Sequence, residues 1–216
     1  MEIFTYGNPS ATTVLVQPIG DQDLDLMARE VEEIEKRAGE DFCLMALKVE
    51  DWNRELSPWK APAVFGREDF GGEAAALLQE TLACCREDGK RYYLGGYSLA
   101  GLFSLWAAYQ TDHFRAVAAV SPSVWFPGFL PYMREHAIQV PAVYLSLGDR
   151  EEKTKNLVMA SVGSCIREGA AWLQRQGVQT VLEWNAGNHF REPEVRTAKG
   201  FVWLMKEGDG KGEAER

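Results

Sequence analysis

Short apolar runs alternate with helix-length amphipathic stretches along this chain, and the alternation limits the folds open to it. The apolar runs predict strands over 12–16, 42–49, 91–95, 116–120, 142–147 and 178–184. The stretches between them predict helices over 23–38, 72–87, 99–109, 154–176 and 193–206. In the first of these helices Leu24, Met27, Val31 and Ile34 form one apolar stripe. Strands that alternate with helices favour an α/β fold, in which a mainly parallel sheet has helices on both faces.

Length and composition fit one such domain. The chain has 216 residues, and 46% of them are hydrophobic, enough for a full core. No linker-like segment divides residues 1–206, so we expect a single α/β domain there, with no inserted cap domain. Residues 207–216 are polar and glycine-rich and predict a flexible tail.

Charge argues against several classes of partner. The formal net charge is −9, and no cluster of Lys and Arg would attract nucleic acid or an anionic membrane. We interpret the acidic residues of 23–38, Glu30 among them, as a solvated face. No apolar run reaches the length of a signal peptide or a membrane span.

The four cysteines match no disulfide framework, and neither they nor the three histidines have metal-ligand spacing. No phosphate-binding glycine turn of the P-loop kind is present. We therefore expect a reduced, cytoplasmic protein that uses no metal and no cofactor. Homo-oligomerisation is left open.

A glycine-rich turn, Gly95-Gly96-Tyr97-Ser98-Leu99-Ala100-Gly101, joins the predicted strand 91–95 to the predicted helix 99–109. A serine in such a turn is held in strained geometry, with its hydroxyl exposed above the sheet as a nucleophile. The pattern is G-x-S-x-G with Ala100 in place of the second glycine, a change of one methyl group. The competing interpretation is that Ser98 merely caps the helix. Because the turn lies between a strand and a helix, we favour Ser98 as nucleophile.

A serine nucleophile needs a base, and the three histidines can be compared by position. His113 lies at the far end of the helix that Ser98 begins, and His136 lies in a polar stretch that we expect to be exposed. His189 follows the last predicted strand, late enough to leave room for an acid between it and Ser98. His189 is the predicted base.

Three acids compete for the position after the strand 142–147. The sequence there is Gly148-Asp149-Arg150-Glu151-Glu152. Spacing from the glycine and the longer side chain favour Glu151 as the residue that orients His189. Asp149 is the second candidate and Glu152 the third.

Oxyanion donors and substrate contacts complete the predicted site. The backbone N–H of Leu99, at the start of a helix, would be one donor, and that of Ile19 or Gly20, after an early strand, the other. Aromatic residues after the strands, Trp52, Trp59 and Trp125, would contact a small acyl substrate. Such residues also close cores, and that alternative stays open.

The serine turn, the segment Ser121-Pro122-Ser123-Val124-Trp125-Phe126, the acid loop and Gly187-Asn188-His189 together resemble the esterase D-like family of the α/β-hydrolase superfamily. The resemblance extends from about residue 13 to residue 204. It implies an α/β-hydrolase fold and cleavage of carboxylic esters through an acyl-enzyme, with Ser98 as nucleophile, Glu151 as acid and His189 as base. The chain departs from the family in lacking a histidine-glycine pair in the early oxyanion loop.

Two other functions remain open from the sequence. The same residues would serve a thioesterase, an acyltransferase or a peptidase, because a fold and its nucleophile do not fix the substrate. The chain could also be a non-catalytic binding protein on a hydrolase scaffold.

Overall fold

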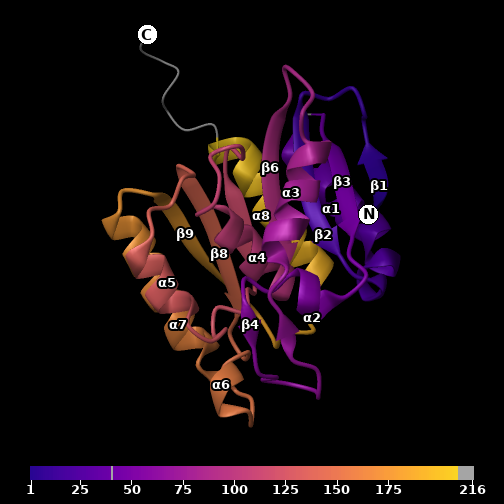
Figure 1. Ribbon diagram of the computed structural model, residues 1–216. Coiled ribbons are helices and arrows are strands. Elements are labelled where there is room, and N and C mark those ends of the chain that lie inside the picture. Colours follow the sequence, from indigo (N-terminus) through magenta and orange to yellow (C-terminus); the bar gives the residue numbers. More distant parts are fainter. Residues whose placement is uncertain (40, 209–216) are drawn as a thin grey trace.

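The computed structural model describes residues 1–39 and 41–208 of the chain (Figure 1). A seven-stranded sheet in the order β1-β3-β2-β6-β7-β8-β9 forms its centre. In chain order its strands are β1 (Glu2–Gly7), β2 (Thr13–Ile19), β3 (Cys43–Lys48), β6 (Arg91–Tyr97), β7 (Val117–Val120), β8 (Ala142–Gly148) and β9 (Gln179–Asn185). Only β1, at one edge, pairs antiparallel, with β3. The predicted α/β class with a mainly parallel sheet is confirmed.

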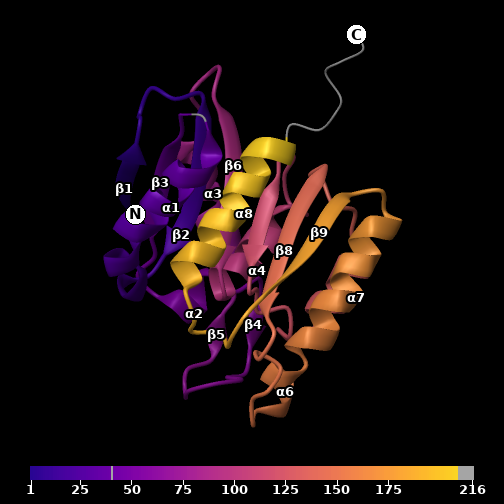
Figure 2. The same ribbon diagram turned by 180° about the vertical axis from the view of Figure 1, so that it is seen from behind.

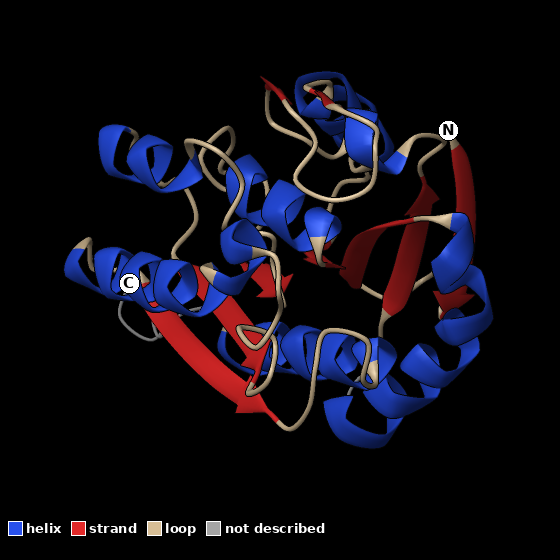
Figure 3. Ribbon diagram, turned by 90° about the horizontal axis from the view of Figure 1, so that it is seen from below, coloured by secondary structure: helices blue, strands red, loops and turns tan. Residues whose placement is uncertain are grey.

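Helices cover both faces of the sheet (Figure 3). The 3₁₀ helix η1 (Asp21–Leu26), α1 (Met27–Ala38) and α8 (Pro193–Glu207) lie on one face, which Figure 2 turns toward the reader. On the other lie α3 (Ala74–Cys84), α4 (Leu99–Ala107), α5 (Phe129–Glu135) and α7 (Val162–Arg175). Successive strand residues point to opposite faces, so Val14 and Val16 join one core and Leu15 the other. The sheet therefore separates two apolar layers.

The parallel strands end at the lower edge of the sheet in Figure 1. Three short elements gather there: α2 (Trp52–Glu55), α6 (Leu157–Ala160) and the hairpin of β4 (Lys60–Ala61) and β5 (Phe70–Gly71). The Asn156 side chain caps α6 by accepting hydrogen bonds from Val158 N–H and Met159 N–H. It also donates to Val64 O at 2.6 Å, which ties α6 to the hairpin. The stretch 154–176 is largely helical, as predicted, and consists of α6 and α7 with a break at Ser161.

The solvated face predicted for the first helix is wrong at Glu30. Its side chain is buried and accepts a hydrogen bond from Gln17 Nε2 at 3.3 Å. Position 30 comes three residues after Met27 and four before Ile34, so it lies on the buried stripe of α1.

The end of the chain differs slightly from the prediction. Glu207, assigned to the tail, is the last residue of α8. The rest of the predicted tail, from residue 209 onward, lies outside the described residues.

Candidate active site

Ser98 lies in a tight turn between β6 and α4. Its backbone has φ 58° and ψ −118°, a left-handed conformation that is costly for a residue with a Cβ. Neighbouring backbone holds it there, because Ser98 N–H donates to Val120 O at 3.0 Å and Ser98 O accepts from Ser123 N–H at 3.1 Å. A Cβ on Gly96 would come within 2.7 Å of the Ala100 backbone and 2.8 Å of the Ala100 methyl group. Ala100 is tolerated in the second glycine position because Gly96 leaves that space free.

His189 lies between Ser98 and Glu151. Its Nε2 is 3.0 Å from Ser98 Oγ, and its Nδ1 is 2.7 Å from Glu151 Oε2. The loop that follows β9 presents the imidazole ring, and the loop that follows β8 presents the carboxylate. The three side chains thus form a continuous chain of hydrogen bonds from a hydroxyl to a buried acid. His113 and His136 lie outside this group and stack on Tyr92 and Tyr132.

Glu151 is buried and fully engaged. Its Oε1 accepts hydrogen bonds from Ser121 Oγ and Gly148 N–H, both at 2.7 Å, and from Arg196 Nη1 at 3.0 Å. Burial alone would raise the pKa of Glu151, but the hydrogen bonds and charge of His189, with the bonds from Ser121 and Gly148, lower it below its ordinary value. The site therefore favours a carboxylate beside the imidazole.

The two competing acids point elsewhere. Asp149 Oδ1 accepts a hydrogen bond from Gly187 N–H at 2.7 Å and so joins the β8 loop to the β9 loop. Glu152 forms an ion pair with Arg167 at 3.2 Å on the protein surface. Of the three candidates, the structure brings Glu151 to His189.

Sequence reasoning missed three residues of this network. Arg196, on α8, is only 2% exposed, and it donates to Glu151 and to the carbonyls of Ala186 and Asn188 on the histidine loop. Ser121 follows β7 directly, a position that could have singled it out. Tyr97 donates its hydroxyl to His189 O at 2.6 Å. Burial, with the charge of Glu151, raises the pKa of Tyr97 to about 12, so the phenol stays protonated as a donor.

A cavity of about 400 Å³ opens beside Ser98 and His189. Trp52 and Trp125 line it as predicted, and Phe65 and Phe190 add two more aromatic rings. Trp59 does not line it. The Trp59 ring packs on α5 and its neighbours, and its Nε1 donates to Pro127 O at 2.9 Å.

The predicted oxyanion donors differ in their surroundings. Leu99 begins α4, where the first backbone N–H groups have no partner within the helix. Ile19 is the last residue of β2, its carbonyl accepts from Val49 N–H at 2.9 Å, and it does not line the cavity. The alternative donor Gly20 is engaged, because its N–H donates to Asp23 Oδ2 at 2.9 Å.

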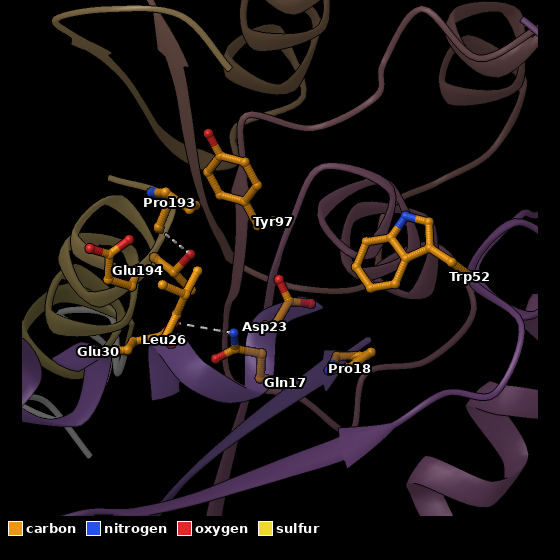
Figure 4. A pocket seen from close by; sticks show the side chains of 10 residues that line it. Gln17, Pro18, Asp23, Leu26, Glu30, Trp52, Tyr97, Pro193 and Glu194 are labelled. Atoms are coloured by element: carbon orange, nitrogen blue, oxygen red, sulfur yellow. Dashed lines mark hydrogen bonds between the residues drawn. The ribbon is translucent and has the colours of Figure 1, made fainter. Parts of the chain in front are cut away.

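A second, much smaller pocket of about 10 Å³ is lined by Tyr97 and by Trp52, which it shares with the large cavity (Figure 4). It has room for about one water molecule. Gln17 Oε1 and Glu30 Oε1 are buried nearby and have no hydrogen-bond partner among the described residues. Burial raises the pKa of Glu30 well above its ordinary value, and the charges of Asp23 and Glu194 raise it further. The carboxyl of Glu30 therefore stays protonated to a higher pH than the carboxyl of an exposed glutamate.

Within residues 1–39 and 41–208, no group of three or more His, Cys, Asp or Glu side chains is arranged to hold a metal ion. In the same residues, no helix is long and apolar enough to cross a membrane.

The sheet order, the helices on both faces and the position of the serine turn define an α/β-hydrolase fold. No protein-family model matches the chain, and no curated protein sequence does. Many solved structures are similar to it, and three of them are given by name. The siderophore hydrolase EstA from Aspergillus nidulans has a TM-score of 0.72 at 16% identity, over 94% of this chain and 89% of that one. Est1E from Butyrivibrio proteoclasticus has a TM-score of 0.60 at 12% identity, over 95% and 93%.

The third is the enterobactin esterase FES from Shigella flexneri, crystallised with enterobactin. It has a TM-score of 0.67 at 17% identity, and the match covers 94% of this chain but 54% of that one. The chain thus spans about half the length of that enzyme. At identities this low the likeness shows the fold alone, and the site must be argued from its own residues.

Proposed function

We propose that this protein is a serine hydrolase that cleaves carboxylic esters through an acyl-enzyme. The observation that carries the proposal is the hydrogen-bonded chain from Ser98 Oγ through His189 to Glu151, with contacts of 3.0 and 2.7 Å. These lengths fit direct proton transfer between the groups. The siderophore hydrolase and the enterobactin esterase among the similar folds support the same reaction class.

In the proposed reaction Ser98 Oγ attacks the ester carbonyl while His189 Nε2 takes the hydroxyl proton. Glu151 orients the ring and stabilises the imidazolium that forms. The C–O bond to the alcohol then breaks, and His189 returns the proton to the leaving alkoxide. A water molecule repeats the sequence on the acyl-enzyme, which releases the acid and restores Ser98.

The oxyanion of each tetrahedral intermediate needs two donors. We assign the backbone N–H of Leu99 as the first, because the start of α4 also places the positive end of the helix dipole there. The N–H of Ile19 is the second donor in this proposal. Ile19 is preferred to Gly20, because the N–H of Gly20 already donates to Asp23.

Labelling with a fluorophosphonate probe, together with hydrolysis of p-nitrophenyl butyrate, tests the proposal. The wild-type protein should label and turn over, while Ser98→Ala should do neither and lose about 10⁴-fold or more in kcat. His189→Ala should cost nearly as much, and the double variant little more, because such residues act as a unit. Ser164→Ala, at an exposed serine of α7, is the matched control and should behave as wild type.

Failure to label Ser98, or additive losses in the double variant, would refute the mechanism. A butyryl thioester assayed in parallel shows whether the same site prefers thioesters.

A further inference from the structure

The large cavity has two walls of different chemistry. Trp52, Phe65 and Trp125 line it from the side of α2 and the β4–β5 hairpin. The segment from β8 to α7 also lines the cavity and contributes Arg150, Lys153 and Thr154, followed by Met159 and Val162. Asn156 joins the two walls through its bond to Val64 O. A ligand in the cavity can therefore contact both aromatic rings and cations.

The two cations are not neutralised by the protein. Within the described residues, neither the Arg150 guanidinium nor the Lys153 ammonium forms an ion pair or a side-chain hydrogen bond. Among the residues that the structure describes, Glu151 is the only carboxylate that lines the cavity, and His189 and Arg196 already engage it. Glu152, on the same loop, is paired with Arg167 outside the cavity.

This distribution stands out against the charge of the whole chain. The protein carries a formal net charge of −9, yet the described residues that line its cavity include two unpaired cations and no unpaired anion. Both cations are solvent-exposed, so they keep their hydration in the free protein at little cost. They would attract an anionic group on a ligand whose apolar part rests on the aromatic wall.

We infer that the site takes esters that carry a second, negatively charged group, with a carboxylate bound by Arg150 and Lys153. Monoesters of dicarboxylic acids and acyl esters of hydroxybenzoates are two such substrates. The inference rests on the proposed function and specifies which part of the ester the cationic wall recognises. Both cations are long and exposed, so they can follow a carboxylate on either the acyl or the alcohol side.

Two matched pairs of esters test this inference. On the acyl side, the mono-p-nitrophenyl ester of adipic acid is compared with p-nitrophenyl hexanoate, which has the same chain length without the charge. On the alcohol side, the hexanoate ester of 4-hydroxybenzoate is compared with that of 4-hydroxybenzamide. We expect the anionic ester of at least one pair to have a kcat/KM about tenfold higher, since two exposed ion pairs contribute about threefold each.

The ratio of kcat/KM for the anionic ester to kcat/KM for the neutral ester should depend on the two cations and on the salt concentration. Arg150→Gln and Lys153→Gln should each reduce the anionic-to-neutral ratio about threefold, and the double variant should abolish the preference. Added salt should reduce the ratio in the wild-type protein by screening. Lys155→Gln, which removes a nearby exposed cation that does not line the cavity, is the charge-matched control and should leave the ratio unchanged.

Two results would overturn the inference while leaving the proposed function standing: the absence of a preference in both pairs, and a preference that survives in the Arg150→Gln/Lys153→Gln variant. If no ester is hydrolysed and the fluorophosphonate probe fails to label Ser98, the proposed function itself is refuted, and this inference with it.

Discussion

Replacing Arg196 by Met should damage both stability and turnover. The guanidinium joins Glu151 to the histidine loop through contacts of 3.0 Å to Glu151 Oε1, 3.2 Å to Ala186 O and 3.0 Å to Asn188 O. The side chains of Arg196 and Glu151, which form this ion pair, are nearly inaccessible to solvent, at 3% and 4% exposure. Removing one partner of a buried pair costs about 3–5 kcal/mol, because the other charge is left without compensation. The free energy of unfolding of a domain is typically about 5–15 kcal/mol, so we expect a large shift in the urea midpoint of unfolding.

The kinetic effect should fall on kcat rather than on KM. Arg196 does not line the cavity, so substrate binding has no direct contact to lose. The loop that carries His189 does lose two anchors, and a displacement of about 1 Å in a reacting group costs about 10²-fold in rate. Arg196→Lys should recover part of the stability but little of the rate, because one ammonium cannot reach both the acid and the loop carbonyls.

Lys199→Met provides the control on the same helix. Lys199 binds Glu183 and Asn185 at 2.6 and 2.8 Å but is about one-third exposed, so its loss should cost at most about 1 kcal/mol. Equal losses of stability in the two Met variants, or a wild-type kcat in Arg196→Met, would show that the buried pair does not position His189.

Three further changes have expected outcomes. Glu151→Gln should reduce ester turnover by orders of magnitude and also lower the melting temperature, because the buried Arg196 guanidinium loses its countercharge, whereas Asp149→Asn should alter melting more than turnover; an orders-of-magnitude loss of turnover in Asp149→Asn but not in Glu151→Gln would make Asp149 the acid. Glu30→Gln should stabilise the protein increasingly as the pH rises above 4.5, because the raised pKa of Glu30 makes its ionisation costly in the folded state. Below pH 4.5 this stabilisation should vanish, and urea unfolding at pH 4 and pH 8 measures the difference. Gly96→Ala should cost about 1–3 kcal/mol and slow turnover, since the added methyl would overlap Ala100; unaltered thermal unfolding would contradict that packing.

Local sequence signals were sufficient for six of the seven strands of the sheet and for the serine turn, but not for the edge strand β1. Continuous apolar runs such as 116–120 predicted buried parallel strands, and the run of glycines around Ser98 predicted the turn that the structure contains. The ends of the strands were harder to predict from the sequence. β2 continues past its predicted end at Val16 through Pro18 to Ile19. Proline is accommodated there because the pairing of β2 with β6 ends at Val16, so the missing N–H interrupts no ladder on that side.

Other site features depend on contacts that no local pattern encodes. Arg196 looks like a solvated position of an amphipathic helix, and only the packing of α8 against β6, β7 and β8 buries it. Trp59 follows β3 as Trp52 does, yet its loop turns the ring toward Pro127 and away from the cavity. Burial of polar side chains is set by the partners they meet in three dimensions, which the spacing of residues along one helix or loop does not specify.

Strained backbone conformations are also found around the candidate active site. In the described part of the chain, three non-glycine residues have positive φ: Ser98 at 58°, Ser121 at 43° and Glu192 at 52°. Ser98 is the proposed nucleophile, Ser121 donates to Glu151, and Glu192 precedes the first turn of α8, where its carbonyl accepts from Arg196 N–H at 3.1 Å. Such conformations cost about 1–3 kcal/mol each and persist only where the surroundings enforce them. Because all three serve one hydrogen-bonded network, the cost is concentrated where the fold fixes the geometry of Ser98, His189 and Glu151.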